Sequence, residues 1–305
     1  MKIYDCFTFY NEFELLELRL KALWDVADYF VIVEANRTFT DNPKDFNFPK
    51  RADDFKIFHS KIRYVAADLS KVPFKGVGDW SIEIAQRNAI MNGIGDAAAD
   101  DLIIISDLDE FPAPDVFRRL QENQITLFAP AVIPVTLADK GITCPAQLLV
   151  SAAAFLEVGA IVMAQELFYY YFDLRNKGTW NGTILTKRKN LTAPQALRYQ
   201  RDQLPRIGGG YHFSYMGGVD RVIDKMQSIV DGNELVVKSG GKFIDRKHVE
   251  ESVNQGEWVF KGAGGTRTIL PYDARNIRLP HIEEFFKKYP NFLREPEKYF
   301  GENNL

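Results

Sequence analysis

The first 105 residues alternate between strand-like and helix-like segments, and this alternation limits the possible folds more than any other feature of the sequence. Strands are predicted at Ile3–Phe9 and Tyr29–Glu34, because both are apolar runs of strand length. Glu12–Trp24 between them predicts a helix, since its leucines fall mostly on one helical face. The pattern continues with a strand within Phe55–Val65, a helix over Asp79–Gly93 and a strand over Leu102–Ser106. Such repetition favours a parallel, doubly wound α/β sheet.

The alternation is less regular after Pro112. No internal repeat or low-complexity linker divides the chain, which predicts a single domain over residues 1–305. The elements predicted here are helices at Asp115–Glu122, 146–157, Val219–Asp231 and 281–300, strands at Ala131–Leu137 and Leu167–Phe172, a turn at Gly208–Gly210 and a flexible loop at 261–268.

The composition is that of an ordinary soluble globular protein, with 46% hydrophobic and 26% charged residues. A net charge of −3 gives no sign of a nucleic-acid partner, although a local basic groove is compatible with that average. Cys6 and Cys144 form no CxxC motif and favour a reducing compartment. The longest apolar stretch, Leu148–Ala164, is shorter than a membrane span and contains Glu157. With no signal peptide at the N-terminus, these features predict a cytoplasmic protein without a membrane span.

The motif SDLDEFP at 106–112 is the strongest candidate for chemistry. Asp107 and Asp109 follow a buried strand, and ligands of open α/β sheets bind at the carboxyl ends of strands. Two carboxylates that share a site either trap a proton or hold a cation. Aspartate oxygens suit Mg²⁺ or Mn²⁺ bridging a diphosphate. The alternative is a solvated acidic turn that caps the next helix. Phe111 and Pro112 exclude an EF-hand, which needs an oxygen ligand and a glycine there.

Five sequence blocks together resemble glycosyltransferase family 17, which contains β-1,4-mannosyl-glycoprotein β-1,4-N-acetylglucosaminyltransferases. The blocks are FTFYNEFELLELRL (7–20), DYFVIVEANRTFT (28–40), WSIEIAQRNAI (80–90), IIISDLDEFP (103–112) and GYHFSYMGG (210–218). The resemblance implies a GT-A-like, Rossmann-like fold with a mostly parallel sheet flanked by helices. Residues 1–112 would form the nucleotide-sugar-binding half, and residues 113–305 the acceptor-side half with a C-terminal helix.

The resemblance also implies roles for individual residues. Asp107, Asp109 and His212 would bind Mn²⁺ or Mg²⁺ on the donor diphosphate, and Glu110 would orient neighbouring groups. The residues expected to bind the UDP-sugar are Asn11, Glu34, Asn36, Arg87, Asn88, Asp107 and Lys225. For Arg87 the alternative is a surface ion pair with Glu83 at i−4. Asn11 and Glu12 end the first strand, where Glu12 is equally well explained as an acid at a helix N-terminus.

An inverting transferase needs a base that takes the proton of the acceptor hydroxyl, and a carboxylate is the expected type. Glu166, Asp173 and Asp220 are all candidates, and the sequence does not choose among them. Trp180 and Tyr169–Tyr171 are candidates for stacking on a sugar ring, with an aromatic core as the alternative.

The expected function is therefore metal-dependent, inverting transfer of GlcNAc or another hexose from a UDP-sugar to a hydroxyl of a glycan, a glycoprotein or another acceptor. Two alternatives stay open at this point. One is a phosphatase or phosphoryl-transfer enzyme that uses the same acids, and the other is a non-catalytic carbohydrate-binding relative.

Overall fold

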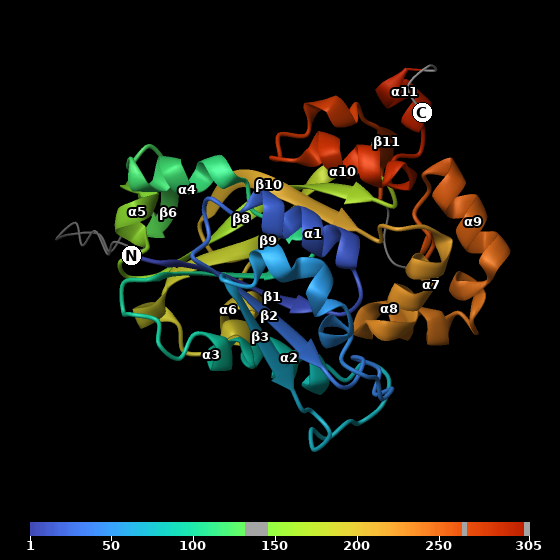
Figure 1. Cartoon of the computed structure of the whole chain (residues 1–305), viewed down its shortest axis with the longest axis horizontal. Helices are drawn as coiled ribbons and strands as arrows, with labels where there is room; N and C mark the ends of the chain where they lie inside the picture. The colour runs from blue at the N-terminus through green and yellow to red at the C-terminus, as the bar shows by residue number, and fades with distance from the viewer. Residues whose placement is uncertain (132–145, 264–266, 302–305) are drawn as a thin grey trace, which may run out of the picture.

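A computed structural model describes residues 1–131, 146–263 and 267–301. One large sheet runs through the molecule in the order β3-β2-β1-β4-β9-β8-β10-β5 (Figure 1). Its first four strands are parallel and arise from the N-terminal alternation of strand and helix. They are β1 (Ile3–Phe9), β2 (Tyr29–Ala35), β3 (Ile62–Ala67) and β4 (Leu102–Asp107). Each lies where the sequence predicts a strand.

The remaining strands of this sheet make it mixed rather than mostly parallel. The pair β8 and β9 is antiparallel, because a short connection joins them, and β9 is also antiparallel to β4. Strand β10 is parallel to β8 and antiparallel to β5. The bounds are β5 (Glu110–Phe111), β8 (Ala160–Tyr169), β9 (Leu174–Lys187), β10 (Arg206–Ser214) and β11 (Ile269–Pro271), the last pairing with β9.

Helices cover both faces of the parallel strands, which confirms the predicted α/β fold class. Because side chains alternate along a strand, β1 directs Phe7 into the core beneath α1 (Phe13–Ala22) and Cys6 into the core beneath α2 (Ser81–Asn88). The short helix α3 (Ile90–Gly93) continues the second layer, so the helix predicted over Asp79–Gly93 is present in two pieces.

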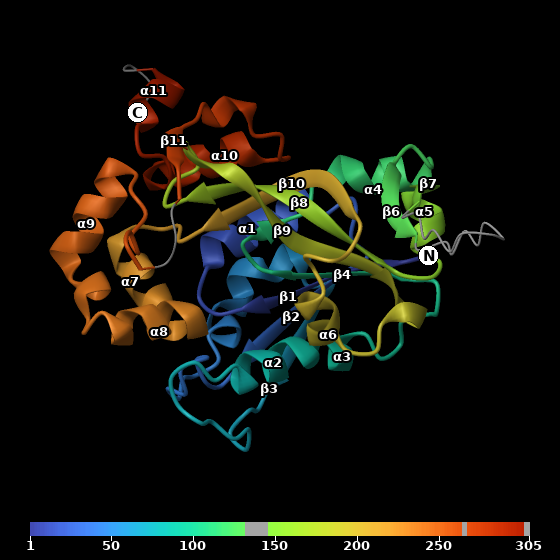
Figure 2. The same ribbon diagram turned by 180° about the vertical axis from the view of Figure 1, so that it is seen from behind.

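The C-terminal helices form two groups (Figures 1 and 2). Helices α7 (Val219–Ser228), α8 (Val230–Lys238) and α9 (Arg246–Gln255) enclose an aromatic core of their own. Helices α10 (Ile282–Lys288) and α11 (Pro296–Phe300) extend the core beneath α1. The other helices are α4 (Pro114–Gln121), α5 (Ala152–Phe155) and α6 (Pro194–Tyr199), with 3₁₀ turns at Phe48–Phe58, Arg188–Asn190, Lys242–Ile244, Ala274–Asn276 and Pro290–Phe292.

The helix predicted over 146–157 is wrong. Its first half is strand β7 (Ala146–Ser151), which pairs along its whole length with β6 (Thr126–Ala131) in a separate two-stranded sheet. Only Ala152–Phe155 is helical, and the Ser151 hydroxyl caps it by accepting from the Ala154 N–H at 3.2 Å. Strand pairing has therefore overridden the helix propensity of an alanine-rich segment.

Four further predictions need correction or lie partly outside the described residues. Gly208–Gly210 is not a turn but part of β10, where a bulge interrupts the pairing with β8. The helix predicted over 281–300 is broken into shorter helices, since Pro290 and Pro296 cannot continue the preceding turn. Of the predicted strand Ala131–Leu137 and loop 261–268, residues 132–137 and 264–266 lie outside the described residues.

Across the three described segments, no helix combines the length and apolar character that crossing a bilayer requires.

Candidate functional site

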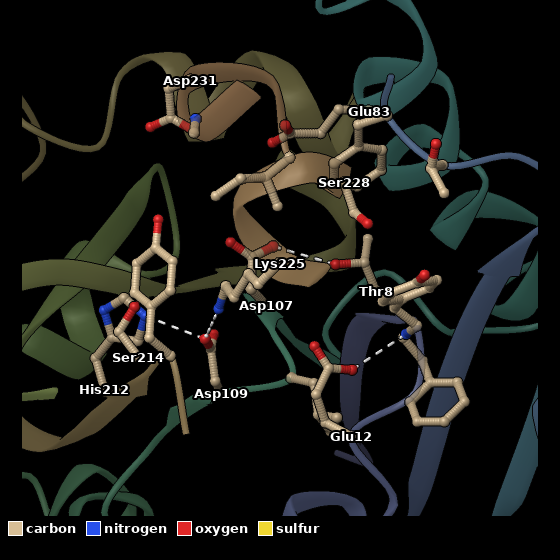
Figure 3. Close-up of a pocket in the computed structure, with 18 of the residues that line it drawn as sticks. Thr8, Glu12, Glu83, Asp107, Asp109, His212, Ser214, Lys225, Ser228 and Asp231 are labelled. Carbon is tan, nitrogen blue, oxygen red and sulfur yellow. Dashed lines mark hydrogen bonds and ion pairs between the residues drawn. The ribbon is translucent and has the colours of Figure 1, made fainter. Parts of the chain in front are cut away.

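A cavity of about 600 Å³ opens at the carboxyl ends of β1 and β4, and we call it the main cavity. Its lining includes residues that follow β1 and β4, parts of α2 and β10, the α6 region and α7 (Figure 3). The volume is within the range of small-molecule sites. The position is the one expected for a ligand of an α/β sheet.

Asp107 is held by two arginines at the end of β4. Its Oδ1 accepts from Arg87 Nη2 at 2.8 Å and from Thr8 Oγ1 at 3.2 Å, and its Oδ2 accepts from Arg198 Nη2 at 2.7 Å. Burial alone would raise the pKa of Asp107, but the two guanidinium charges hold it well below its usual range. Asp107 is therefore ionised at every pH near neutrality.

Asp109 faces a different cation. Lys225 Nζ on α7 lies 2.6 Å from Asp109 Oδ2, and His212 Nε2 on β10 lies 3.4 Å from the same oxygen (Figure 3). Burial opposes ionisation of Asp109, yet the charges of Lys225 and His212 lower its pKa. Burial would likewise lower the pKa of Lys225, and the carboxylates of Asp109 and Glu12 raise it instead. The pair is thus charged on both sides.

Glu110 stabilises the conformation of residues 107–110, which we call the acidic turn. Its carboxylate is buried and accepts from Arg198 Nη2 at 2.5 Å, from Trp180 Nε1 at 2.6 Å and from the Asp107 N–H at 3.0 Å. Arg198 also donates to the Gly182 carbonyl at 2.6 Å. Glu110 therefore orients the groups around it.

The glycines before His212 let β10 approach this turn. Gly209 and Gly210 have φ of +149° and +92°, and a Cβ on Gly210 would lie 2.1 Å from the Phe111 carbonyl oxygen. Only glycine fits such a contact and such a φ. The close approach places His212 opposite Glu110 in the β10–β5 ladder, and so beside Asp109.

Of the predicted donor-binding residues, Asn11, Arg87, Asp107 and Lys225 line the main cavity. Asn11 Nδ2 donates to Asp224 at 3.0 Å. The neighbouring Glu12 also lines the cavity, with its Oε2 accepting from the backbone N–H groups of Tyr10 and Asn11. Burial raises the pKa of Glu12.

Glu34, Asn36 and Asn88 are outside the lining and have other roles. Glu34 is fully buried and accepts from Lys44, from the Phe48 N–H and from the Tyr64 hydroxyl, so it holds the chain after β2 in place. Asn36 bonds to Asp68 and to the Leu69 N–H. Asn88 accepts from the Gln195 N–H and thereby fixes the start of α6.

None of the three candidate bases reaches the main cavity. Glu166 pairs with Arg175 at 3.2 Å, and Asp173 accepts from backbone N–H groups of the C-terminal segment. Asp220 is exposed at the start of α7, where Arg246 pairs with it. The carboxylates that line the cavity besides Asp107 and Asp109 are Glu12, Glu83, Asp202, Asp224 and Asp231.

The aromatic candidates divide in the same way. Trp180 and Tyr169 line the main cavity, whereas Tyr170 and Tyr171 do not. Tyr170 is buried, with its hydroxyl between the Glu257 carbonyl and the Val259 N–H. The core interpretation therefore holds for Tyr170.

The predicted metal ligands come only partly together. Asp109 and His212 are adjacent, but Lys225 lies on the shared Asp109 oxygen, and both oxygens of Asp107 accept from arginines. Within residues 1–131, 146–263 and 267–301, no three His, Cys, Asp or Glu side chains surround one point as metal ligands would. In this arrangement the side chains do not fit a divalent cation, because the protein's own cations occupy the acids.

Arg198 and Arg201 are site residues that the sequence did not reveal. Arg198 contacts Glu110 from 88 positions away and belongs to no motif. The one available signal was indirect, since three acids within four positions require cations nearby. The sequence analysis predicted a metal as the source of that charge, and in the structure Arg87, Arg198 and Lys225 pair with Asp107 and Asp109.

Comparisons with known proteins agree on the N-terminal region. Residues 1–130 match the sequence model of glycosyltransferase family 17. The human β-1,4-mannosyl-glycoprotein 4-β-N-acetylglucosaminyltransferase is 31% identical over 128 residues, which cover 39% of this chain and 24% of that protein. The mouse protein of the same name is 30% identical over 128 residues, covering 39% of this chain and 23% of its own length. The chain therefore spans about a quarter of the length of these relatives.

Among solved structures, one of UDP-glucose pyrophosphorylase complexed with UDP-glucose is similar at 10% identity and a TM-score of 0.28, covering 69% of this chain and 91% of that one. A likeness this slight supports no conclusion about the site. The sequence match is the informative comparison, and it includes β1, β4 and the acidic turn that border the main cavity. Residues 1–130 of this chain are therefore similar to glycosyltransferase family 17.

Proposed function

We propose that the main cavity binds a UDP-sugar and that the protein transfers the sugar, GlcNAc in the first instance, to a hydroxyl of a glycan or glycoprotein. The observation that carries this proposal is the meeting of Arg87, Arg198 and Lys225 with the acids at the end of β4. The names of the relatives support GlcNAc as the sugar and a mannosyl glycoprotein as the acceptor.

Transfer requires positive charge where the diphosphate leaves, because negative charge develops there as the glycosidic bond breaks. Lys225 and Arg87 both line the cavity and are both fixed by carboxylates. Fixed cations need no reorganisation during the reaction, which is the condition under which such groups stabilise a transition state most. The requirement for Mn²⁺ or Mg²⁺ stays a prediction from the sequence, and no step here depends on it.

The base must be a carboxylate that lines the cavity. Glu83 is held by Arg87, and Asp224 accepts from Tyr10, Asn11 and Ser228. Glu12, Asp202 and Asp231 are the other three lining carboxylates. These five carboxylates are the ones to substitute, each glutamate by Gln and each aspartate by Asn. Loss of a base is expected to lower kcat by roughly 10²–10⁴-fold and to leave donor binding intact.

The test is calorimetric titration of the full chain with UDP, UDP-GlcNAc, UDP-glucose and UDP-galactose, in Mn²⁺ and in EDTA, beside Lys225→Met. Binding that Lys225→Met weakens, followed by transfer to a mannose-containing glycan, is the expected result. Absence of nucleotide binding in both media would contradict the proposal. Phosphate release from a simple phosphoester would then favour the phosphatase, and glycan binding without nucleotide would favour the carbohydrate-binding relative.

A further inference from the structure

Most cations that line the main cavity are already paired. Arg87 and Arg198 contact Asp107, Lys225 contacts Asp109, and the same holds for Arg37 with Asp41 and for Arg221 with Glu14. Lys44 is paired with the buried Glu34. These cations balance acids of the protein itself.

Two lining arginines, Arg201 and Arg267, have no such partner among the described residues, and Arg201 is the more buried of the two. It lines the cavity just beyond the end of α6, and among the described residues its guanidinium makes no hydrogen bond or ion pair. Its chain neighbour Asp202 is turned to Asn181 instead, which donates to it at 2.7 Å. A partly buried guanidinium without an acceptor is costly unless a ligand supplies one.

The position of Arg201 is fixed by packing. Its Cζ lies 4.3 Å from the ring centroid of Trp180, a cation–π contact. Trp180 is itself held by its 2.6 Å hydrogen bond to Glu110, and Arg198 by its pairing with the same carboxylate. Helix α6 packs beside α2 (Figure 2). Arg198 on this helix pairs with the acids, and Arg201 just beyond its end lines the main cavity.

The electrostatics of this corner favour an anion. Burial and then the positive charge of Arg198 lower the pKa of Arg201, so the site is crowded with positive charge on its α6 side. A bound anion would relieve that crowding and accept the planar, two-pronged donation that guanidinium offers.

We infer that Arg201 binds the diphosphate of the donor, with Trp180 as the platform that holds the guanidinium in place. This inference rests on the proposed function, because it names a residue of the same site that contacts the substrate. Arg201 thereby adds a second positive charge at the leaving group besides that of Lys225.

The experiment is calorimetry with uridine, UMP and UDP on the wild-type chain, on Arg201→Gln and on Arg201→Lys. Arg119→Gln is the matched control, since Arg119 is a half-buried arginine of α4 outside the cavity. Arg201→Gln should weaken UDP binding at least tenfold and change uridine binding less than twofold, because only the phosphates lose a contact. Arg201→Lys should recover part of the loss. Circular dichroism shows whether each variant is folded.

A second readout uses Trp180. Binding of UDP at Arg201 should change the fluorescence of the ring beneath it, and Trp180→Phe should remove most of that change. If Arg201→Gln binds UDP within twofold of the wild type, or loses uridine equally, the inference is wrong while the proposed function stands. If the wild type binds no UDP at all, both are wrong.

Discussion

The Lys225 ammonium and the Asp109 carboxylate lie 2.6 Å apart although 116 positions separate them in the chain. Asp109 belongs to the family-matched region and Lys225 to a helix beyond it. The ammonium contacts Asp109 Oδ2, the oxygen that a divalent cation would need as a ligand. His212 Nε2 lies 3.4 Å from the same oxygen. A divalent cation at Asp109 would therefore have to displace the Lys225 ammonium.

This displacement predicts a gain of metal binding when the lysine is removed. Lys225→Met should bind Mn²⁺ more tightly than the wild type in the absence of nucleotide, because Asp109 and His212 are then adjacent without a cation between them. Titration followed by electron paramagnetic resonance measures the free Mn²⁺. Lys238→Met, at an exposed lysine of α8, is the control. Equal affinity in Lys225→Met and the wild type would show that the lysine does not exclude the metal.

Arg198 is expected to be important for stability as well as for the site. Arg198→Met leaves Glu110 buried and Asp107 partly buried without one of their cations, which costs about 3–5 kcal/mol in the free energy of unfolding. Arg119→Met should cost less than about 1 kcal/mol, because its partner Asp115 is exposed and 3.7 Å away. Urea unfolding of both variants measures the difference. A similar cost for the two would mean that the buried pairing contributes little.

The bulge in β10 gives a matched pair of glycine substitutions. Gly210→Ala should destabilise the fold by about 1–3 kcal/mol, because its Cβ would lie 2.1 Å from the Phe111 carbonyl oxygen at a φ of +92°. Gly208→Ala has no atom within 4 Å of the added Cβ and should change stability by less than about 0.5 kcal/mol. Thermal unfolding compares the two, and equal values would contradict the strain assigned to Gly210.

Glu12 predicts a pH dependence of stability. Burial raises its pKa above the ordinary 4.5, so the folded state favours the protonated acid. The contribution of the protonated acid to the free energy of unfolding is complete below pH 4.5. It is lost as the pH rises through the higher pKa of the folded state. Glu12→Gln keeps an oxygen acceptor for the Tyr10 and Asn11 N–H groups but removes the charge.

The variant should therefore gain in melting temperature over the wild type as the pH rises from 4 to 8. Glu283→Gln, at an exposed acid of α10, should show no such trend. If the difference in melting temperature between Glu12→Gln and the wild type does not change with pH, burial does not disfavour the ionised form of Glu12.

The N-terminal half was predictable because its signals are local. Ile3–Phe9 and Leu102–Ser106 are apolar runs of strand length, and parallel strands deliver their carboxyl ends to one edge. Hence Asp107 and Asp109 lie where the sequence places them, at the mouth of a cavity.

The second half depends on contacts between distant segments, which a single sequence does not show. β7 is a strand only because β6 pairs with it, and Gly208–Gly210 is a bulge only because β5 passes close by. Glu166 and Asp173 flank an aromatic segment as expected, but in the folded β8–β9 hairpin neither of them lines the main cavity.

Arg198 forms ion pairs with both Asp107 and Glu110, and this has a consequence for folding during translation. On a ribosome, Arg198 follows Glu110 by 88 residues. At about 5–20 residues per second, roughly 4–18 s pass between the synthesis of Glu110 and that of Arg198. Strand β9, the neighbour of β4, is also still to come. A fragment that stops at residue 130 contains the whole family match, yet it would emerge with those acids lacking Arg198 and one side of β4 unpaired. The nascent chain can complete the ion pairs of Asp107 and Glu110 with Arg198 only after most of the protein has been translated.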